Sequence, residues 1–208
     1  MSERPKESWG SGDAYELWVG RWSRIIGGAF VDWLAIPPGQ TWGDVGCGTG
    51  ALAGCILGRS DPAGVLGIDR SEAYVCEARN RVGDARARFE VGDACALPWT
   101  TATCGVTVSG LVLNFVPDSD AMVHEMVRVT RPGGRVAAYV WDYAGGMQMI
   151  RHFWDVALAL NRDDAQLDQA ERFPLCQPDP LEQLFRRVGL NSVSVRAIDV
   201  PTVFRDFE

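Results

Sequence analysis

Residues 44–50 read Asp-Val-Gly-Cys-Gly-Thr-Gly, and this stretch decides how the rest of the chain is interpreted. A short strand is predicted before it, over Thr41–Val45, and a helix after it, over Gly50–Leu57. Glycines between a strand and a helix let the backbone approach a ligand, at the edge where α/β sheets bind small molecules. With Ala51 in the last place, the pattern also suits a nicotinamide or flavin dinucleotide, so the stretch alone does not identify its ligand.

The rest of the chain alternates between segments with strand character and segments with helix character. Further strands are predicted over Val65–Ile68, Ala87–Val91, Val106–Leu113, Arg135–Trp141 and Ser192–Val200. Helices are predicted from Ser71 to Val82, from Asp118 or Asp120 to Val129, over Met149–Leu160 and from Asp179 to Gly189. This alternation predicts an α/β fold, in which helices cover both faces of a doubly wound, mostly parallel sheet.

A helical segment precedes the first strand. Its apolar residues recur at helical spacing: Tyr15, Trp18, Val19, Trp22, Ile26, Ala29, Phe30 and Trp33. We predict either one helix over residues 13–35 or two short helices separated by a break near Gly27-Gly28. We expect residues 1–36 to form an N-terminal helical lid and residues 37–208 to form the main domain.

Composition and charge exclude several classes of protein. The chain has 208 residues, of which 47% are hydrophobic and 23% charged, as in an ordinary globular domain. A net charge of −7 disfavours nucleic acids and anionic membranes as partners. The uncharged run over residues 100–117 contains several polar residues and ends in proline, so we expect no membrane span. The polar N-terminus does not have the pattern of a signal peptide.

The cysteines point to a reduced protein. They stand at positions 47, 55, 76, 95, 104 and 176, and no two have the Cys-x-x-Cys spacing of a zinc site. We therefore expect free thiols that pack as small apolar groups, no metal site, and a cytoplasmic location.

Three more motifs follow the later strands. Gly67-Ile68-Asp69 ends the second strand, and an acidic residue there can bind two ribose hydroxyls. Gly92-Asp93-Ala94 ends the third strand, where a carboxylate can accept a hydrogen bond from an adenine amino group; dinucleotide folds do not require this residue. Residues 128–136, Arg-Val-Thr-Arg-Pro-Gly-Gly-Arg-Val, lead from a helix through a glycine turn into the fifth strand.

The chain resembles the class I S-adenosylmethionine-dependent methyltransferases in the order and spacing of four motifs, DVGCGTG, GID, GDACALPW and RVTRPGGRVAAY. The resemblance is to the type 11 group, related to ubiquinone/menaquinone C-methyltransferases, and covers residues 40–142; residues 15–24 resemble an N-terminal segment of some of these proteins. It implies a Rossmann-like sheet of strand order 3-2-1-4-5-7-6. Only Pro201–Glu208 follows the expected sixth strand, so we expect the seventh strand to be absent from this chain, which would be truncated at its C-terminus.

The resemblance implies a site for S-adenosylmethionine, with S-adenosylhomocysteine as product. The loop against the methionine part would consist of Gly46, Cys47, Gly48, Thr49 and Gly50. Asp44 would lie near the amino group, and Tyr15 and Arg21 would contact the carboxylate from the lid. The residues beside the sulfonium, at the end of the fourth strand, would be Ser109, Gly110 and Leu111.

The resemblance also implies a place for the adenosine part. Asp69 would bind the ribose hydroxyls, and Arg70 would flank the adenine. Asp93 and the backbone of Ala94 would read the adenine amino edge, after the turn at Gly92.

The chemistry follows from this cofactor. A methyl group on a sulfonium is already activated, so the protein mainly aligns donor and acceptor for in-line transfer and excludes water. No catalytic signature is then required, and the catalytic residues stay unassigned; His152, Asp142 and Tyr143 are weak candidates for a base, and His124 is expected to face solvent. Asn114-Phe115, after the fourth strand, is a candidate border of the acceptor pocket.

The acceptor is expected to be a small molecule. The Asn/Asp-Pro-Pro-aromatic motif, which amino-methylating DNA enzymes place after the fourth strand, is absent, and the protein is acidic. The main alternative is a cofactor-binding protein without methyl transfer, as a sensor or partner subunit. An NAD(P)-dependent oxidoreductase is disfavoured by Asp93 and by the Pro-Gly-Gly turn. The sequence does not indicate the oligomeric state.

Overall fold

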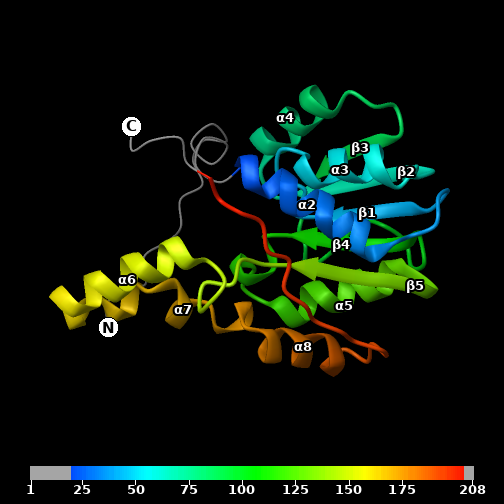
Figure 1. Cartoon of the computed structure of the whole chain (residues 1–208). Coiled ribbons are helices and arrows are strands. Elements are labelled where there is room, and N and C mark those ends of the chain that lie inside the picture. Colours follow the sequence, from blue (N-terminus) through cyan, green and yellow to red (C-terminus); the bar gives the residue numbers. More distant parts are fainter. Residues whose placement is uncertain (1–19, 204–208) are drawn as a thin grey trace.

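The structure is a computed structural model that describes residues 20–203, and its centre is a five-stranded parallel sheet (Figure 1). The strands are β1 (Thr41–Val45), β2 (Gly64–Asp69), β3 (Ala87–Val91), β4 (Cys104–Gly110) and β5 (Thr130–Tyr139). Their order is β3-β2-β1-β4-β5, with Trp42 of β1 paired to Val65 on one side and to Val106 on the other. The α/β fold and the predicted order of the first five strands are confirmed.

Helices cover both faces of the sheet (Figure 1). The α-helices are α2 (Arg21–Leu34), α3 (Ala51–Arg59), α4 (Glu72–Val82), α5 (Ser119–Val129), α6 (Gln148–Leu160), α7 (Gln169–Arg172) and α8 (Pro178–Arg187). Short 3-10 helices are η2 (Leu113–Phe115), η3 (Arg162–Leu167) and η4 (Pro174–Cys176). Two predicted N-caps are confirmed: the Ser71 hydroxyl accepts from the Tyr74 N–H, and the Asp118 carboxylate accepts from the Ala121 N–H.

The core has two halves, one on each face of the sheet. Because successive side chains of a strand point to opposite faces, Trp42 and Val45 of β1 enter different halves. Fully buried Trp42 packs with residues of α2, α3 and α4, including Phe30 and Ile56. Val45 packs with α5 and α8, including Met122. The sheet is therefore packed against a hydrophobic core on each of its faces.

Helix α2 runs unbroken through Gly27-Gly28, so the alternative with a break at these glycines is wrong. A Cβ on Gly27 would lie 3.4 Å from Cys55 Sγ and from Tyr139 Oη, and one on Gly28 would lie 2.9 Å from Arg59 Nε. The two glycines thus allow close packing of α2 against α3 and the sheet. Their helical cost, about 1 kcal/mol each, is offset by this contact.

The remainder of the predicted N-terminal segment lies outside the described residues. This includes Tyr15 and the rest of residues 1–19. Within α2, Phe30, Val31 and Leu34 belong to the core of the sheet. The role of residues 1–36 as a lid, the division at residue 37 and the truncation at the C-terminus stay predictions.

Two predicted strands, the fourth and the fifth, end earlier in the structure than expected. β4 ends at Gly110 rather than Leu113, because Leu111 adopts a left-handed conformation with φ of 61° that turns the chain into η2. β5 begins at Thr130 and ends at Tyr139, not Trp141, and a shift of register between Cys104 and Val106 accommodates its glycine turn.

Residues 192–200 form no strand, so the predicted sixth strand is wrong. A strand needs a neighbour to complete its hydrogen bonds, and within residues 20–203 β5 pairs with β4 alone. The alternating apolar residues of this segment instead anchor an extended chain, with Val193 and Ile198 packed against the two halves of the core.

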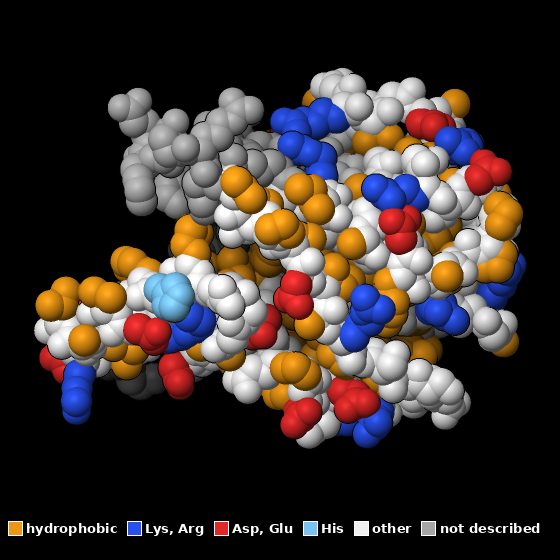
Figure 2. Space-filling view, in the orientation of Figure 1, with side chains coloured by type: hydrophobic (Ala, Val, Ile, Leu, Met, Phe, Trp, Pro, Cys, Tyr) orange, Lys and Arg blue, Asp and Glu red, His pale blue; other side chains and the backbone are white. Residues whose placement is uncertain are grey.

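Helices α6 and α7 form an arm that projects beyond the end of β5 (Figure 1). The buried carboxylate of Asp168 accepts three hydrogen bonds of 2.8–2.9 Å from the guanidinium of Arg151. Trp154 Nε1 donates to Gln169 Oε1 at 2.6 Å. The exposed side of α6 carries an apolar stripe, seen on the arm in Figure 2, of Met149, Phe153, Val156 and Leu160. No helix within residues 20–203 is long and apolar enough to cross a membrane.

The Arg151–Asp168 pair should determine the stability of this arm. In Arg151→Met the Asp168 carboxylate, whose side chain is 5% exposed, stays buried without its cation. We expect α6 and α7 to lose about 3 kcal/mol of local stability, measured by hydrogen exchange of their backbone amides. Arg186→Met is the control, because it removes an exposed pair with Glu182 and should cost less than about 0.5 kcal/mol. Equally small losses in both variants would contradict this role.

Candidate functional site

The loop after β1 is tied to the end of β2. The N–H groups of Gly46 and Cys47 both donate to the carbonyl of Ile68, at 2.8 and 2.9 Å. Gly46 has φ of 76°, and a Cβ there would lie 2.6 Å from Val112. Gly48 and Gly50 also have positive φ, and nothing lies within 4 Å of a Cβ built on Gly48. The loop thus requires glycine for its shape and leaves space beside Gly48.

Asp69, at the end of β2, has an ordered carboxylate. Its Oδ2 accepts from the Gly48 N–H at 3.0 Å, and its Oδ1 accepts from the Ser71 N–H at 2.9 Å. Each oxygen keeps a further lone pair. The half-buried carboxylate can therefore accept from a vicinal diol while it holds the glycine loop in place.

Asp93, after β3, lies beside Asp69. The Gly92 N–H donates to the Asp69 carbonyl at 3.0 Å, and a Cβ on Gly92 would lie 2.4 Å from Ile68 Cδ1. The exposed Asp93 side chain accepts from the Cys95 N–H at 2.8 Å. Arg70 is also exposed, and nothing in the structure assigns it a contact with the site.

An ion pair on α5 fixes the loop that carries Asp93. Glu125 accepts from the Leu97 N–H at 2.8 Å and from Arg128, which lowers the pKa of Glu125. Arg128 donates to the carbonyls of Leu97 and Trp99, both at 2.9 Å. Sequence reasoning missed this pair, which faces the loop rather than solvent.

Asp44 is a buried carboxylate with no hydrogen-bond partner for either oxygen within residues 20–203. It is 1% exposed. Burial and, to a lesser degree, the negative charge of Asp69 raise its pKa from 3.8 to about 7, and the nearby Ala53 N–H opposes part of this rise. A buried, unpaired anion is costly unless a cation or a donor meets it. Asp44 thus fits a positively charged ligand group.

Cys47 does not supply a nucleophile. Its thiol is 6% exposed, and its pKa is raised strongly by burial and by the charges of Asp44 and Asp69. The thiol therefore stays protonated at neutral pH. All six cysteines fall within residues 20–203 and are free thiols; three of them are buried, whereas Cys76 is exposed and does not pack as predicted.

The end of β4 meets the glycine loop. Ser109 is fully buried, and its Oγ has no hydrogen-bond partner among the described residues. A Cβ on Gly110 would lie 2.6 Å from Tyr139 Oη, and the Leu111 N–H donates to the Tyr139 carbonyl at 2.8 Å. Val112 then packs over Gly46. The aspartate carboxylates, the buried polar atoms without hydrogen-bond partners and the glycine loop thus all lie at the carboxyl ends of the strands.

These groups fit a ligand with a diol, an adenine and a cationic centre. A family model described as a methyltransferase domain matches residues 43–138. A ubiquinone/menaquinone biosynthesis C-methyltransferase from Cereibacter sphaeroides is 37% identical over 207 residues, which cover 91% of this chain and 78% of the relative. The chain belongs to the S-adenosylmethionine-dependent methyltransferases, type 11.

The chain is also similar to a further curated relative and, in its fold, to a solved structure. A 2-phytyl-1,4-naphtoquinone methyltransferase from Thermosynechococcus vestitus is 40% identical over 111 residues, 51% of this chain and 48% of the relative. A crystal structure from Methanococcus maripaludis, described as an S-adenosyl-L-methionine-dependent methyltransferase, superposes with a TM-score of 0.67. It is 20% identical and covers 96% of this chain and 93% of that one, which shows the shared fold. The predicted enzyme class and its cofactor, S-adenosylmethionine, are confirmed over the alternatives.

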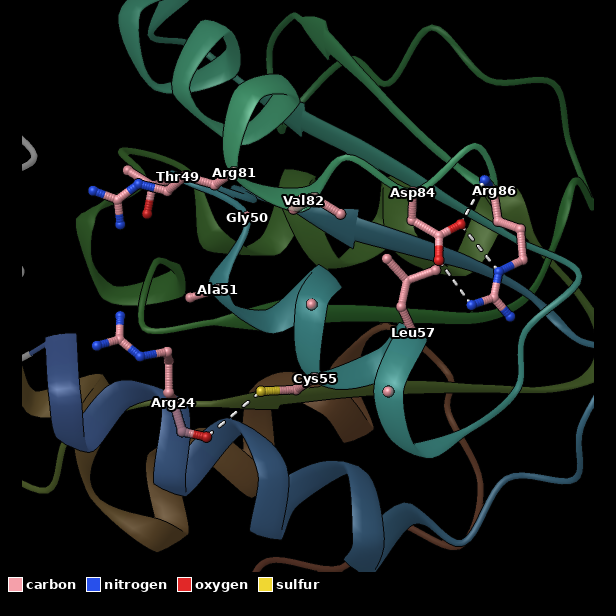
Figure 3. A pocket seen from close by; sticks show the side chains of 12 residues that line it. Arg24, Thr49, Gly50, Ala51, Cys55, Leu57, Arg81, Val82, Asp84 and Arg86 are labelled. Atoms are coloured by element: carbon pink, nitrogen blue, oxygen red, sulfur yellow. Dashed lines mark hydrogen bonds and ion pairs between the residues drawn. The ribbon is translucent and has the colours of Figure 1, made fainter.

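A groove of about 550 Å³ flanks the glycine loop of the methyltransferase, between α2, α3 and α4 (Figure 3). It shares Thr49 and Gly50 with the loop, but Asp44, Asp69 and Asp93 do not line it. The groove is therefore a neighbour of the site. Its lining includes Arg24, which sequence reasoning did not assign although it stands three residues after Arg21. The side chain of Arg21 lies outside what the structure describes.

The weak candidates for a general base have other roles or positions. Asp142 accepts from the N–H groups of Ala144, Gly145 and Gly146, at 2.8–3.0 Å, so it organises its own loop. His124 is exposed, as predicted, and bonds the Asp120 carbonyl at 2.8 Å. His152 is exposed on α6. Asp142 and His124 are thus engaged in local hydrogen bonds, and His152 faces solvent.

The charge state of Asp44 should make stability depend on pH. The folded protein raises the pKa from 3.8 to about 7, so it binds this proton more tightly than the unfolded chain does. The stabilisation that this tighter proton binding gives the folded protein is complete below about pH 4 and is lost as pH rises through 7. Asp44→Asn carries no charge at this position. We therefore expect its free energy of unfolding, relative to that of the wild type, to increase by on the order of 3 kcal/mol between pH 4 and pH 8.

Urea unfolding at the two pH values measures this difference. Asp199→Asn changes an exposed carboxylate and is the matched control, with no expected pH-dependent gain. If Asp44→Asn changes the free energy of unfolding by the same amount at pH 4 and at pH 8, the pKa of Asp44 is not raised in the folded protein.

Proposed function

We propose that the enzyme methylates a ring carbon of a quinol-type small molecule. Relatives named for ubiquinone/menaquinone, phytylhydroquinone and phytylnaphthoquinone substrates support this acceptor class. The observation that carries the proposal for this chain is an aromatic wall at the carboxyl ends of β4 and β5, made by Phe115, Tyr143 and Phe173.

The aromatic wall joins three elements. Phe115 in η2 meets Phe173 edge-on, with ring centroids 5.2 Å apart. Tyr143, after β5, lies 5.6 Å from Phe173, which follows α7 in the arm. Aromatic faces attract both planar rings and cations, so the wall suits a quinol ring that meets a positively charged methyl donor.

We propose that the cofactor is held as the sequence predicts. Asp69 would accept from the ribose hydroxyls and Asp93 from the adenine, because both stand at adjacent strand ends with free lone pairs. Asp44 would face the cationic end, where its buried carboxylate lacks a partner. Gly46–Gly50 would lie under the methionine part, and Ser109–Leu111 beside the sulfonium.

The protein would contribute orientation and shielding from bulk water, and the ring carbon that gains the methyl group would lose its hydrogen as a proton that passes to water. S-adenosylmethionine, when bound, supplies a methyl group already activated by its positive sulfur. Asp44 would balance the positive charge, and the aromatic wall would hold the acceptor ring in line. Such positioning accounts for a large part of the rate of an intrinsically reactive pair. This agrees with the exposed histidines and the engaged Asp142.

We further propose that the enzyme works in the cytoplasm, on an acceptor that diffuses to it or is delivered from a membrane. We also propose that it does not bind nucleic acid. The net charge of −7 supports the last point, because phosphate backbones repel an acidic surface. The free thiols agree with a reducing compartment.

Methyl transfer from isotopically labelled S-adenosylmethionine tests the proposed reaction. Chemically reduced 1,4-naphthoquinone, with a hydrogen beside each ring oxygen, is expected to gain one methyl group on carbon, identified by NMR of the product. The quinol of 2,3-dimethyl-1,4-naphthoquinone is the control, because both of these positions are blocked. Methylation on oxygen, or equal turnover of both quinols, would overturn the proposal.

A further inference from the structure

We propose that Asn114 is an acceptor-binding residue, whose amide N–H donates to a ring oxygen of the acceptor. This inference rests on the proposed function and adds a residue to it. Asn114 Nδ2 is buried and has no hydrogen-bond partner among the described residues. A buried donor is costly to leave unpaired, and most such donors in proteins are paired with a protein atom, an ordered water or a ligand.

The position of Asn114 between two parts of the site identifies its ligand. Two residues before it, Val112 packs over Gly46 of the cofactor loop. The next residue, Phe115, belongs to the aromatic wall through its contact with Phe173. Leu113, fully buried in the core, anchors η2 from below. Asn114 thus stands in η2 between a residue that packs on the proposed cofactor loop and a residue of the aromatic wall.

The chemistry of the amide selects the kind of acceptor. Nδ2 carries two N–H donors, so its partner must be an oxygen or another acceptor atom. A planar ring against Phe115 and Phe173 would bring an oxygen on its edge to such a donor. The hydrogen bond is stronger to an ionised oxygen than to a neutral one. Asn114 would therefore favour a phenolic acceptor over a bare aromatic ring and lower the pKa of its hydroxyl, whose proton passes to solvent water.

Two probe molecules separate the contribution of this hydrogen bond to affinity from the contribution of ring packing. 1-Naphthol carries the oxygen, and naphthalene lacks it. Binding of each is measured by NMR with S-adenosylhomocysteine present, for the wild type and for Asn114→Leu, which keeps a similar volume and removes the donor. We expect the wild type to bind 1-naphthol at least tenfold more tightly than naphthalene. In Asn114→Leu this preference should fall below threefold, with naphthalene affinity unchanged.

Controls separate a binding role from a structural one. Asn80→Leu changes an exposed amide on α4 and should keep the preference of the wild type. The affinity of Asn114→Leu for S-adenosylmethionine should stay within twofold of the wild type, because Asn114 is not among the cofactor residues. In Asn114→Leu the acidic limb of the pH profile for quinol turnover should move to higher pH.

The outcomes distinguish the two proposals. A wild type that binds both probes equally, or neither at millimolar concentration, overturns the role of Asn114. So does an Asn114→Leu variant that keeps the preference. If the preference depends on Asn114 but reduced 1,4-naphthoquinone is not methylated on carbon, the donor site stands and the proposed reaction fails.

Discussion

The site depends on one backbone constraint, the left-handed turn at Gly46 that directs two successive N–H groups to the Ile68 carbonyl. This turn ties the ends of β1 and β2 together, and a side chain at Gly46 would collide with Val112 after β4. The Gly48 N–H then reaches Asp69, whose own carbonyl holds Gly92 after β3. Four strand ends are thereby fixed relative to one another before any ligand enters.

Within this frame the enzyme keeps groups that cost stability. The Asp44 carboxylate, the Ser109 hydroxyl and the Asn114 amide are buried polar groups with atoms that lack partners among the described residues. Each is expensive in the ligand-free protein, and such costs persist where binding later supplies a partner. In our proposal, Asp44 meets the cationic end of the cofactor and Asn114 meets the acceptor oxygen. The Arg151–Asp168 pair supports the arm that carries Phe173 of the aromatic wall, since Phe173 directly follows α7.

Local sequence signals predict the elements that the site needs. The caps at Ser71 and Asp118, the first three strands and the acidic residues at Asp69 and Asp93 follow from patterns a few residues long. Features set by distant contacts do not follow. The glycines of α2 serve packing against Cys55 and Arg59, and residues 192–200 lack a strand partner despite their alternation. Likewise, Glu125 and Arg128 have an ordinary helical spacing, and only the fold brings Leu97 and Trp99 to them.

The central claim is that a cationic cofactor lies over the buried Asp44 carboxylate. Titration calorimetry of S-adenosylmethionine at pH 7, in two buffers of different ionisation enthalpy, tests it most directly. Since the pKa of Asp44 is about 7 in the free enzyme, a positive ligand should displace about half a proton, and the measured heat should differ between the buffers. Binding with the same heat in both buffers, or no binding, would contradict the account.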